Sequence, residues 1–263
     1  MHRISEVFAT FVALTIVAAG SAFAQTDANQ QSAQDQKQES ATRLADQTIP
    51  KLAAWQTDQA KAELESKPGE LGDTASFKTA WGFLRAVEGK PDEGLGILSD
   101  ASKADAKNPA PEFLRGEVLS WQKKSGEATA AYQRAADRAT SCLAAQPNDA
   151  RALYYLGAAN VRLKKFDAAR SKLEAALKAG YDRALVKYQI GLSYAFEKKW
   201  EAAKAAFDES IQANSGFAHA YFYRGRVWKE LKRTDEMLRD MDRFVKLAPN
   251  APEAPIARSI LGG

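Results

Sequence analysis

The chain has 263 residues, 45% of them hydrophobic, and a formal net charge of +4. So small a charge excludes the dense basic surface that is typical of nucleic-acid-binding proteins, and we expect no nucleic-acid partner. One cysteine and two histidines exclude an intramolecular disulfide and a zinc site built from Cys and His ligands.

Residues 1–24 have the pattern of a secretory signal peptide. A polar start that contains Arg3 precedes an apolar run over 7–19, and Ala22 and Ala24 are the small residues of a cleavage site before Gln25. The apolar run is too short to cross a bilayer comfortably, because a spanning helix needs about 20 residues. We therefore expect secretion across the inner membrane and a periplasmic location. An uncleaved N-terminal anchor is the alternative.

The next two segments differ in composition. Residues 25–42 are rich in glutamine and nearly free of apolar side chains, so they are expected to form a disordered tether. Residues 43–74 carry apolar residues such as Leu52 and Leu64 at helical spacing, interrupted by Pro50. This segment is expected to form N-terminal capping helices.

From residue 75 onward a glycine recurs with a nearly fixed stride of 34 residues. Its members are Gly82, Gly116, Gly157, Gly191 and Gly225. Only the step from Gly116 to Gly157 differs, being seven residues longer. Seven residues make close to two helical turns, so this step predicts one overlong helix that ends before Pro147. A period in this range indicates a solenoid of stacked helix pairs.

The residues that follow each glycine complete the pattern. Small residues occur at Ala169 and Ala203, and larger apolar residues fill the positions of Leu173, Phe207 and Met241. A glycine inside a helix costs about 0.5–1 kcal/mol relative to alanine. Its recurrence at one phase predicts that the second helix of each pair passes close to it.

These residues resemble the tetratricopeptide repeat, a helix–turn–helix unit of 34 residues. The resemblance implies an all-α fold, a right-handed α-solenoid of about five helix pairs with N- and C-terminal capping helices. The solenoid would cover 75–263, with repeats near 75–108, 109–149, 150–183, 184–217 and 218–251 and a C-terminal cap at 252–261.

No catalytic motif is found in the sequence. It lacks a glycine-rich phosphate loop and the GxSxG and HExxH motifs. Carboxylate pairs on repeat helices are better explained as solvated faces. We therefore expect a protein that is not an enzyme and that uses no cofactor or metal.

The resemblance also implies that the first helix of each pair lines a concave groove that binds partners. Helical projection places an aromatic residue at one equivalent groove position in four repeats, namely Phe113, Tyr154, Tyr188 and Phe222. The same projection places five basic residues nearby, namely Arg151, Arg162, His219, Arg226 and Lys229. Such a groove would favour apolar ligands that carry a carboxylate. The alternative is that the aromatic residues pack between neighbouring repeats.

A second basic feature lies at the turn inside each pair. We name it the basic ridge, and it consists of Lys123, Lys124, Lys164, Lys165, Lys198, Lys199, Lys232 and Arg233. Cations at helix C-termini gain about 0.3–1 kcal/mol from the helix dipole, which favours a structural role. The functional alternative is weak contact with an anionic envelope surface.

These features favour an exported scaffold that binds a peptide segment or protein partner in its groove. Analogy with the family suggests a role in cell-envelope assembly or maintenance. The alternative is a structural protein, an oligomer-forming or envelope-tethered spacer without a peptide ligand. The sequence does not identify the partner or the oligomeric state.

Overall fold

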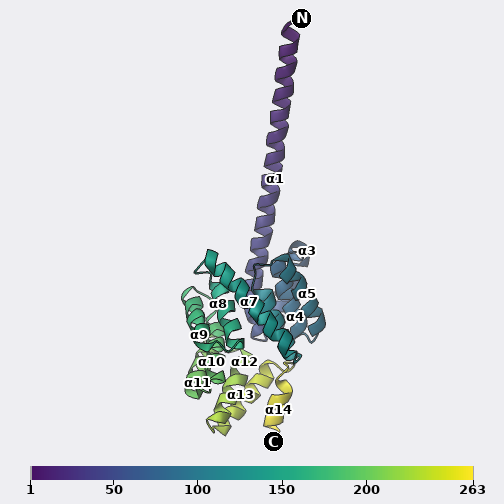
Figure 1. Ribbon diagram of the computed structural model, residues 1–263. Coiled ribbons are helices and arrows are strands. Elements are labelled where there is room, and N and C mark those ends of the chain that lie inside the picture. Colours follow the sequence, from purple (N-terminus) through teal and green to yellow (C-terminus); the bar gives the residue numbers. More distant parts are fainter. Residues whose placement is uncertain (1, 263) are drawn as a thin grey trace.

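The computed structural model describes residues 2–262, and their side chains from residue 28 onward. Within this range the chain forms fourteen helices and no strands (Figure 1). The helices stack as an α-solenoid, with a long N-terminal helix that projects from the body. The expected all-α solenoid is confirmed.

Five helix pairs make up the body. They are α4 (Ala75–Val87) with α5 (Pro91–Ala104), α6 (Ala110–Trp121) with α7 (Ser125–Ala145), α8 (Ala150–Arg162) with α9 (Phe166–Lys178), α10 (Arg183–Phe196) with α11 (Trp200–Ala213), and α12 (Ala218–Glu230) with α13 (Thr234–Leu247). Each second helix also packs against the first helix of the next pair, and α14 (Ala254–Leu261) covers α13. The overlong helix is α7, with 21 residues.

The repeat glycines lie where the two helices of a pair cross. A Cβ atom on Gly157 would lie 2.6 Å from Leu173 Cγ, and one on Gly191 would lie 2.6 Å from Phe207 Cε1. Both distances are shorter than van der Waals contact, so a side chain at these positions would push the pair apart. The predicted close approach is therefore confirmed.

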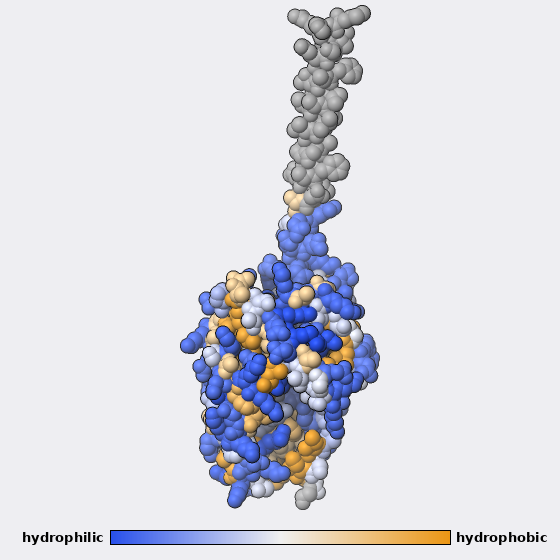
Figure 2. All heavy atoms as spheres, in the orientation of Figure 1, coloured by the Kyte–Doolittle hydropathy of each residue, from blue (hydrophilic) through white to orange (hydrophobic). Residues whose placement is uncertain are grey.

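Residues 25–42, expected to be a disordered tether, are helical. They belong to α1 (His2–Ala53), which also continues through Pro50. Glutamine, alanine, glutamate and lysine are good helix formers, and no glycine or proline interrupts 25–42. The helix is anchored from its C-terminal end, where Ala41 and Leu52 are fully buried. Over 28–42, low apolar content accounts for the exposure of most side chains rather than for disorder, as the hydrophilic surface of these residues in Figure 2 illustrates.

The prediction that residues 1–24 form a signal peptide concerns side chains outside the described residues, and it stays a prediction. No helix in the described part of the chain is both long enough and apolar enough to cross a bilayer.

The end of α1 connects the two ends of the solenoid. With α2 (Thr57–Glu65) and α3 (Pro68–Leu71), α1 packs beside the first repeat. The turn after α1 then reaches the fifth repeat. The Ala218 N–H donates to the Ala54 carbonyl at 3.4 Å, and Gln56 Nε2 donates to Asn214 Oδ1 at 3.3 Å. We name residues 54–56 the closing segment, because they join the first repeat to the last across the concave side.

Candidate functional site

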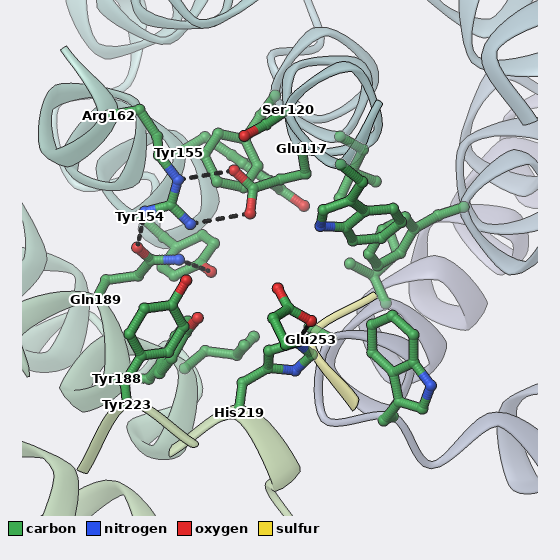
Figure 3. Close-up of a pocket in the computed structure, with 18 of the residues that line it drawn as sticks. Glu117, Ser120, Tyr154, Tyr155, Arg162, Tyr188, Gln189, His219, Tyr223 and Glu253 are labelled. Carbon is green, nitrogen blue, oxygen red and sulfur yellow. Dashed lines mark hydrogen bonds and ion pairs between the residues drawn. The ribbon is translucent and has the colours of Figure 1, made fainter. Parts of the chain in front are cut away.

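The concave side contains a cavity of about 200 Å³ (Figure 3). The first helices α6, α8, α10 and α12 form most of its wall, and Phe83 of α4, the end of α1 with Trp55, and Glu253 complete it. The cavity therefore collects side chains from all five repeats and from the segments that flank them.

One side of the cavity is formed by a buried ion pair. Arg162 Nε and Nη2 donate to the two carboxylate oxygens of Glu117 at 2.8 and 2.9 Å. Tyr132 donates to the same carboxylate at 2.7 Å, and Gln189 Oε1 accepts from Arg162 Nη1 at 3.2 Å. Burial opposes the Arg162 charge, but Glu117 holds the pKa of the guanidinium well above its ordinary value. The Arg162 guanidinium therefore stays charged, with Glu117 as its ion-pair partner.

Three tyrosines form the adjoining side. The hydroxyl groups of Tyr154, Tyr188 and Tyr223 point into the cavity (Figure 3). Burial raises the pKa of each phenol, that of Tyr223 to about 12. The phenols therefore remain neutral hydrogen-bonding groups. Tyr154 accepts one weak bond, from Gln189 Nε2 at 3.5 Å.

The opposite side is formed by His219 and Glu253. Their Nε2 and Oε2 atoms lie 3.2 Å apart. Burial opposes ionisation of Glu253, but its interaction with His219 outweighs burial and lowers the pKa of the carboxyl below its ordinary value. Glu253 is therefore ionised at neutral pH. Its carboxylate points toward the middle of the cavity in Figure 3.

Trp55 of the closing segment covers this end of the cavity. Its ring lies 5.0 Å from the ring of His219 and 5.7 Å from that of Trp121. Its backbone has φ of +66°, in the left-handed region that non-glycine residues rarely adopt. The concave face is thus occupied in part by a non-helical segment of the same chain.

The predicted groove residues are only partly brought together. Five of them line the cavity, namely Phe113, Tyr154, Tyr188, Arg162 and His219. The four aromatic residues predicted to share one groove position are all buried, Phe222 included, so the packing alternative describes them better than an open wall does. Phe222 does not line the cavity. It packs 5.0 Å from Phe244, and His219 and Tyr223 provide the cavity wall in that repeat.

The other three predicted groove residues lie elsewhere. Arg151 contacts Asp46 of α1 at 3.6 Å, beside a separate cavity. Arg226 is exposed, with its guanidinium 5.8 Å from the ring of Tyr223, and Lys229 is exposed. Helical projection placed them on the correct helices but did not account for the closing segment and α1, which divide the concave side.

Sequence reasoning missed Glu117, Gln189, Tyr223, Glu253 and Trp55. Projecting acids as well as bases onto the first helices would have placed Glu117 opposite Arg162. No short-range signal could place Trp55 and Glu253 in the same site, because nearly two hundred residues separate them.

All eight residues of the basic ridge are exposed, as expected for an edge of the solenoid. Its four leading lysines, Lys123, Lys164, Lys198 and Lys232, have φ between +59° and +61°. At the same phase the first repeat has Gly89, with φ of +85°. Lys199 pairs with Glu197, and Arg233 pairs with Glu236. Among the described side chains, the other six ridge residues have no carboxylate at ion-pair distance.

Among the described residues, no group of three His, Cys, Asp or Glu side chains is placed to hold a metal ion. Cys142 is half-buried, and burial raises the pKa of its thiol.

The stacked helix pairs and their shared concave wall place this protein in the class of helical repeat proteins. The family model of the tetratricopeptide repeat matches residues 122–184 and 188–255. The chain belongs to the tetratricopeptide repeat family, whose repeats form scaffolds suited to protein–protein interaction.

One solved structure supports this fold. The chain is similar to a thermophilic TPR protein of Thermus thermophilus, with a TM-score of 0.56 and 17% identity over 72% of this chain and 100% of that one. The chain is also similar to PilF of Pseudomonas aeruginosa, with a TM-score of 0.41 and 20% identity over 86% of this chain and 98% of that one. A third similar structure is YrrB, described as a TPR protein with an unusual peptide-binding site. Its TM-score is 0.40, with 18% identity over 74% of this chain and 97% of that one. No curated protein matches the sequence.

Proposed function

We propose that this protein is an exported, periplasmic scaffold that holds a segment of a protein partner on its concave side during cell-envelope assembly or maintenance. The observation that supports it best is the closing segment. A non-helical stretch of the chain already lies on the concave wall, so this wall accepts a peptide backbone. We infer that a partner segment binds there by replacing residues 54–56.

The contacts of the closing segment fit such an exchange. Its two hydrogen bonds to the last two repeats, at 3.4 Å with Ala218 and 3.3 Å with Asn214, are long, and its central residue is in the left-handed region. A left-handed conformation costs about 1–2 kcal/mol for a residue other than glycine. Release of the segment would recover this strain and expose the rings of Trp121 and His219, which Trp55 covers.

Site-specific photocrosslinking tests the exchange. A photoreactive residue at Tyr188 should crosslink a discrete protein partner in cells, and more strongly when Trp55→Ala weakens the closing segment. A photoreactive residue at Glu174, exposed on α9, is the matched control. Equal capture from both positions, or weaker capture in the Trp55→Ala variant, would contradict the proposal.

Export is tested separately. We expect the mature protein to begin at Gln25 and to be released with the periplasmic fraction. Intact mass of the purified protein decides this, because an uncleaved chain keeps residues 1–24.

The basic ridge supports a weak contact with an anionic envelope surface. Lysine at a left-handed position is less favourable than glycine, yet it recurs in four repeats, which suggests a role besides turn formation. Charge reversal at Lys164, Lys165, Lys198 and Lys199 should weaken envelope association, and the wild-type association should fall with salt. Unchanged fractionation of the variant would exclude this contact.

The spacer remains the second candidate, because two features suit it. Helix α1 projects far from the body (Figure 1), and the opposite end carries an apolar patch at α14 (Figure 2), where Ile256 is 56% exposed and Leu261 is 37% exposed. Size-exclusion chromatography with light scattering separates the candidates. A stable oligomer of the wild type that dissociates in the Ile256→Asp variant would favour the spacer.

A further inference from the structure

Four side chains that can carry a charge line the cavity. They are Glu117, Arg162, His219 and Glu253. Glu117 and Arg162 cancel each other in a two-bond ion pair. Among the described side chains, His219 is the only group at ion-pair distance from Glu253.

His219 contacts Glu253 through one ring nitrogen. Its Nε2 atom faces Glu253, and its Nδ1 atom is buried without a hydrogen-bond partner. Among the described side chains, no lysine or arginine lies at ion-pair distance from Glu253. The Glu253 carboxylate, which points toward the middle of the cavity in Figure 3, therefore lacks a permanently cationic partner.

Aromatic rings line the same space. Trp55 and Trp121 lie on the side of Glu253 and His219, and Tyr188 and Tyr223 lie on the adjoining side. Cations bind favourably over the faces of aromatic rings, and the attraction grows when water is excluded. A carboxylate surrounded by aromatic rings is therefore suited to an organic cation.

The cavity is large enough for such a ligand. Its volume is about 200 Å³. An apolar cavity of about 150 Å³ accommodates benzene, so a ring that carries an ammonium group is within reach. An anionic ligand is less suitable, because Arg162 is already saturated by Glu117 and Gln189, and Glu253 would repel it.

We propose that the cavity binds a primary ammonium group, which donates to Glu253 and to the tyrosine hydroxyls and packs against the tryptophan rings. The ammonium belongs either to a small amine or to the free N-terminus of a peptide. Such a ligand binds with the closing segment in place, so its binding is independent of the exchange proposed above.

Titration calorimetry on the full chain tests the ligand chemistry. Benzylamine, benzyl alcohol and benzoate have nearly the same shape and differ in charge. Benzylamine should bind at least about tenfold more tightly than either of the others, because only its ammonium group brings a positive charge to the Glu253 carboxylate. Equal binding of the amine and the alcohol, or no binding of the amine, overturns the proposal.

A conservative variant tests the residue. Glu253→Gln keeps the shape and can still accept from His219, and it should weaken benzylamine binding at least about tenfold. Glu230→Gln, at an exposed position of α12, is the matched control and should leave the affinity unchanged. Equal effects of the two variants overturn the assignment. The comparison of the three ligands on the wild-type chain needs no variant to fold.

The source of the ammonium is decided with a short peptide and its N-acetylated form. Tighter binding of the free peptide than of benzylamine, lost on acetylation, identifies a peptide N-terminus. Binding of benzylamine but of neither peptide identifies a small amine. If the acetylated peptide binds as well as the free one, the ammonium does not decide binding and the proposal is wrong.

Discussion

At the residue scale, the crossing glycines determine how closely each helix pair can pack. A Cβ atom at Gly191 would lie 2.6 Å from Phe207, a residue that is itself fully buried. Neither helix can yield without moving the next repeat, because each second helix also packs against the following pair.

Replacing Gly191 with alanine should therefore destabilise the protein by about 1–3 kcal/mol through overpacking. The control is Gly96→Ala, since Gly96 is exposed inside α5 with nothing within 4 Å of an added Cβ. That control should stabilise the protein by about 0.5–1 kcal/mol through helix propensity. Urea unfolding of both variants measures the difference, and equal signs would contradict the close-approach explanation.

The leading ridge lysines give a second residue-scale prediction. Lys198 has φ of +59°, where glycine is free of strain. Lys198→Gly should stabilise the protein by about 0.5–1 kcal/mol, because relief of the left-handed strain exceeds the loss of favourable charge at the helix terminus. Thermal unfolding at low and high salt separates the two contributions. A loss of stability at high salt would show that the turn does not need glycine.

At the element scale, Glu112 links three helices. It lies at the start of α6, accepts from Ser102 of α5, and pairs with Arg134 of α7 at 2.9 Å. Its side chain is only 3% exposed. Burial opposes its charge, but Ser102 and the nearby arginines outweigh burial and hold the pKa below the ordinary value of 4.5.

This lowered pKa predicts acid sensitivity. A group whose folded pKa is depressed stabilises the fold above its unfolded pKa, and the contribution is lost as pH falls through the folded pKa. Between pH 6 and about pH 4.5 the contribution of Glu112 should be complete, and below that it should decline. Glu112→Gln should cost about 1–3 kcal/mol at pH 7 and should flatten the decline below pH 4.5. Unfolding midpoints of the wild type and the variant from pH 7 to 3 measure the loss at pH 7 and the change in slope. If the two proteins lose stability in parallel as the pH falls, the assignment to Glu112 is wrong.

The elements also show which features short-range sequence signals can predict. The glycine stride predicted the helix pairs, the crossings and the length of α7, because each depends on residues within one repeat. The composition of residues 25–42 indicates disorder, whereas their helix propensity and their anchored C-terminal end favour the helix that forms. Of the predicted groove residues, five line the cavity. Arg162 and Tyr188 follow the repeat, whereas Trp55 and Glu253 reach it from outside the repeats, by contacts that no periodicity encodes.

At the scale of the whole molecule, the closing segment joins parts of the chain that a solenoid normally keeps apart. Gln56 and Asn214 are 158 residues apart in sequence. Trp55→Ala should remove this link while leaving the helix pairs intact. Hydrogen exchange should then speed up in α12 and α14 but not in α9, which lies away from the segment. Uniform acceleration would mean that the repeats unfold as one unit regardless of the link.

In an open solenoid, stability is close to a sum over neighbouring units, so folding can start anywhere and either end can fray alone. A solenoid whose first and last repeats are linked by the closing segment loses that freedom. During synthesis, Trp55 leaves the ribosome long before the fifth repeat exists, and its indole has no wall to cover until the last helices are made. The concave side therefore forms last, and a chain truncated in its final repeat would retain ordered helices yet expose this tryptophan to water.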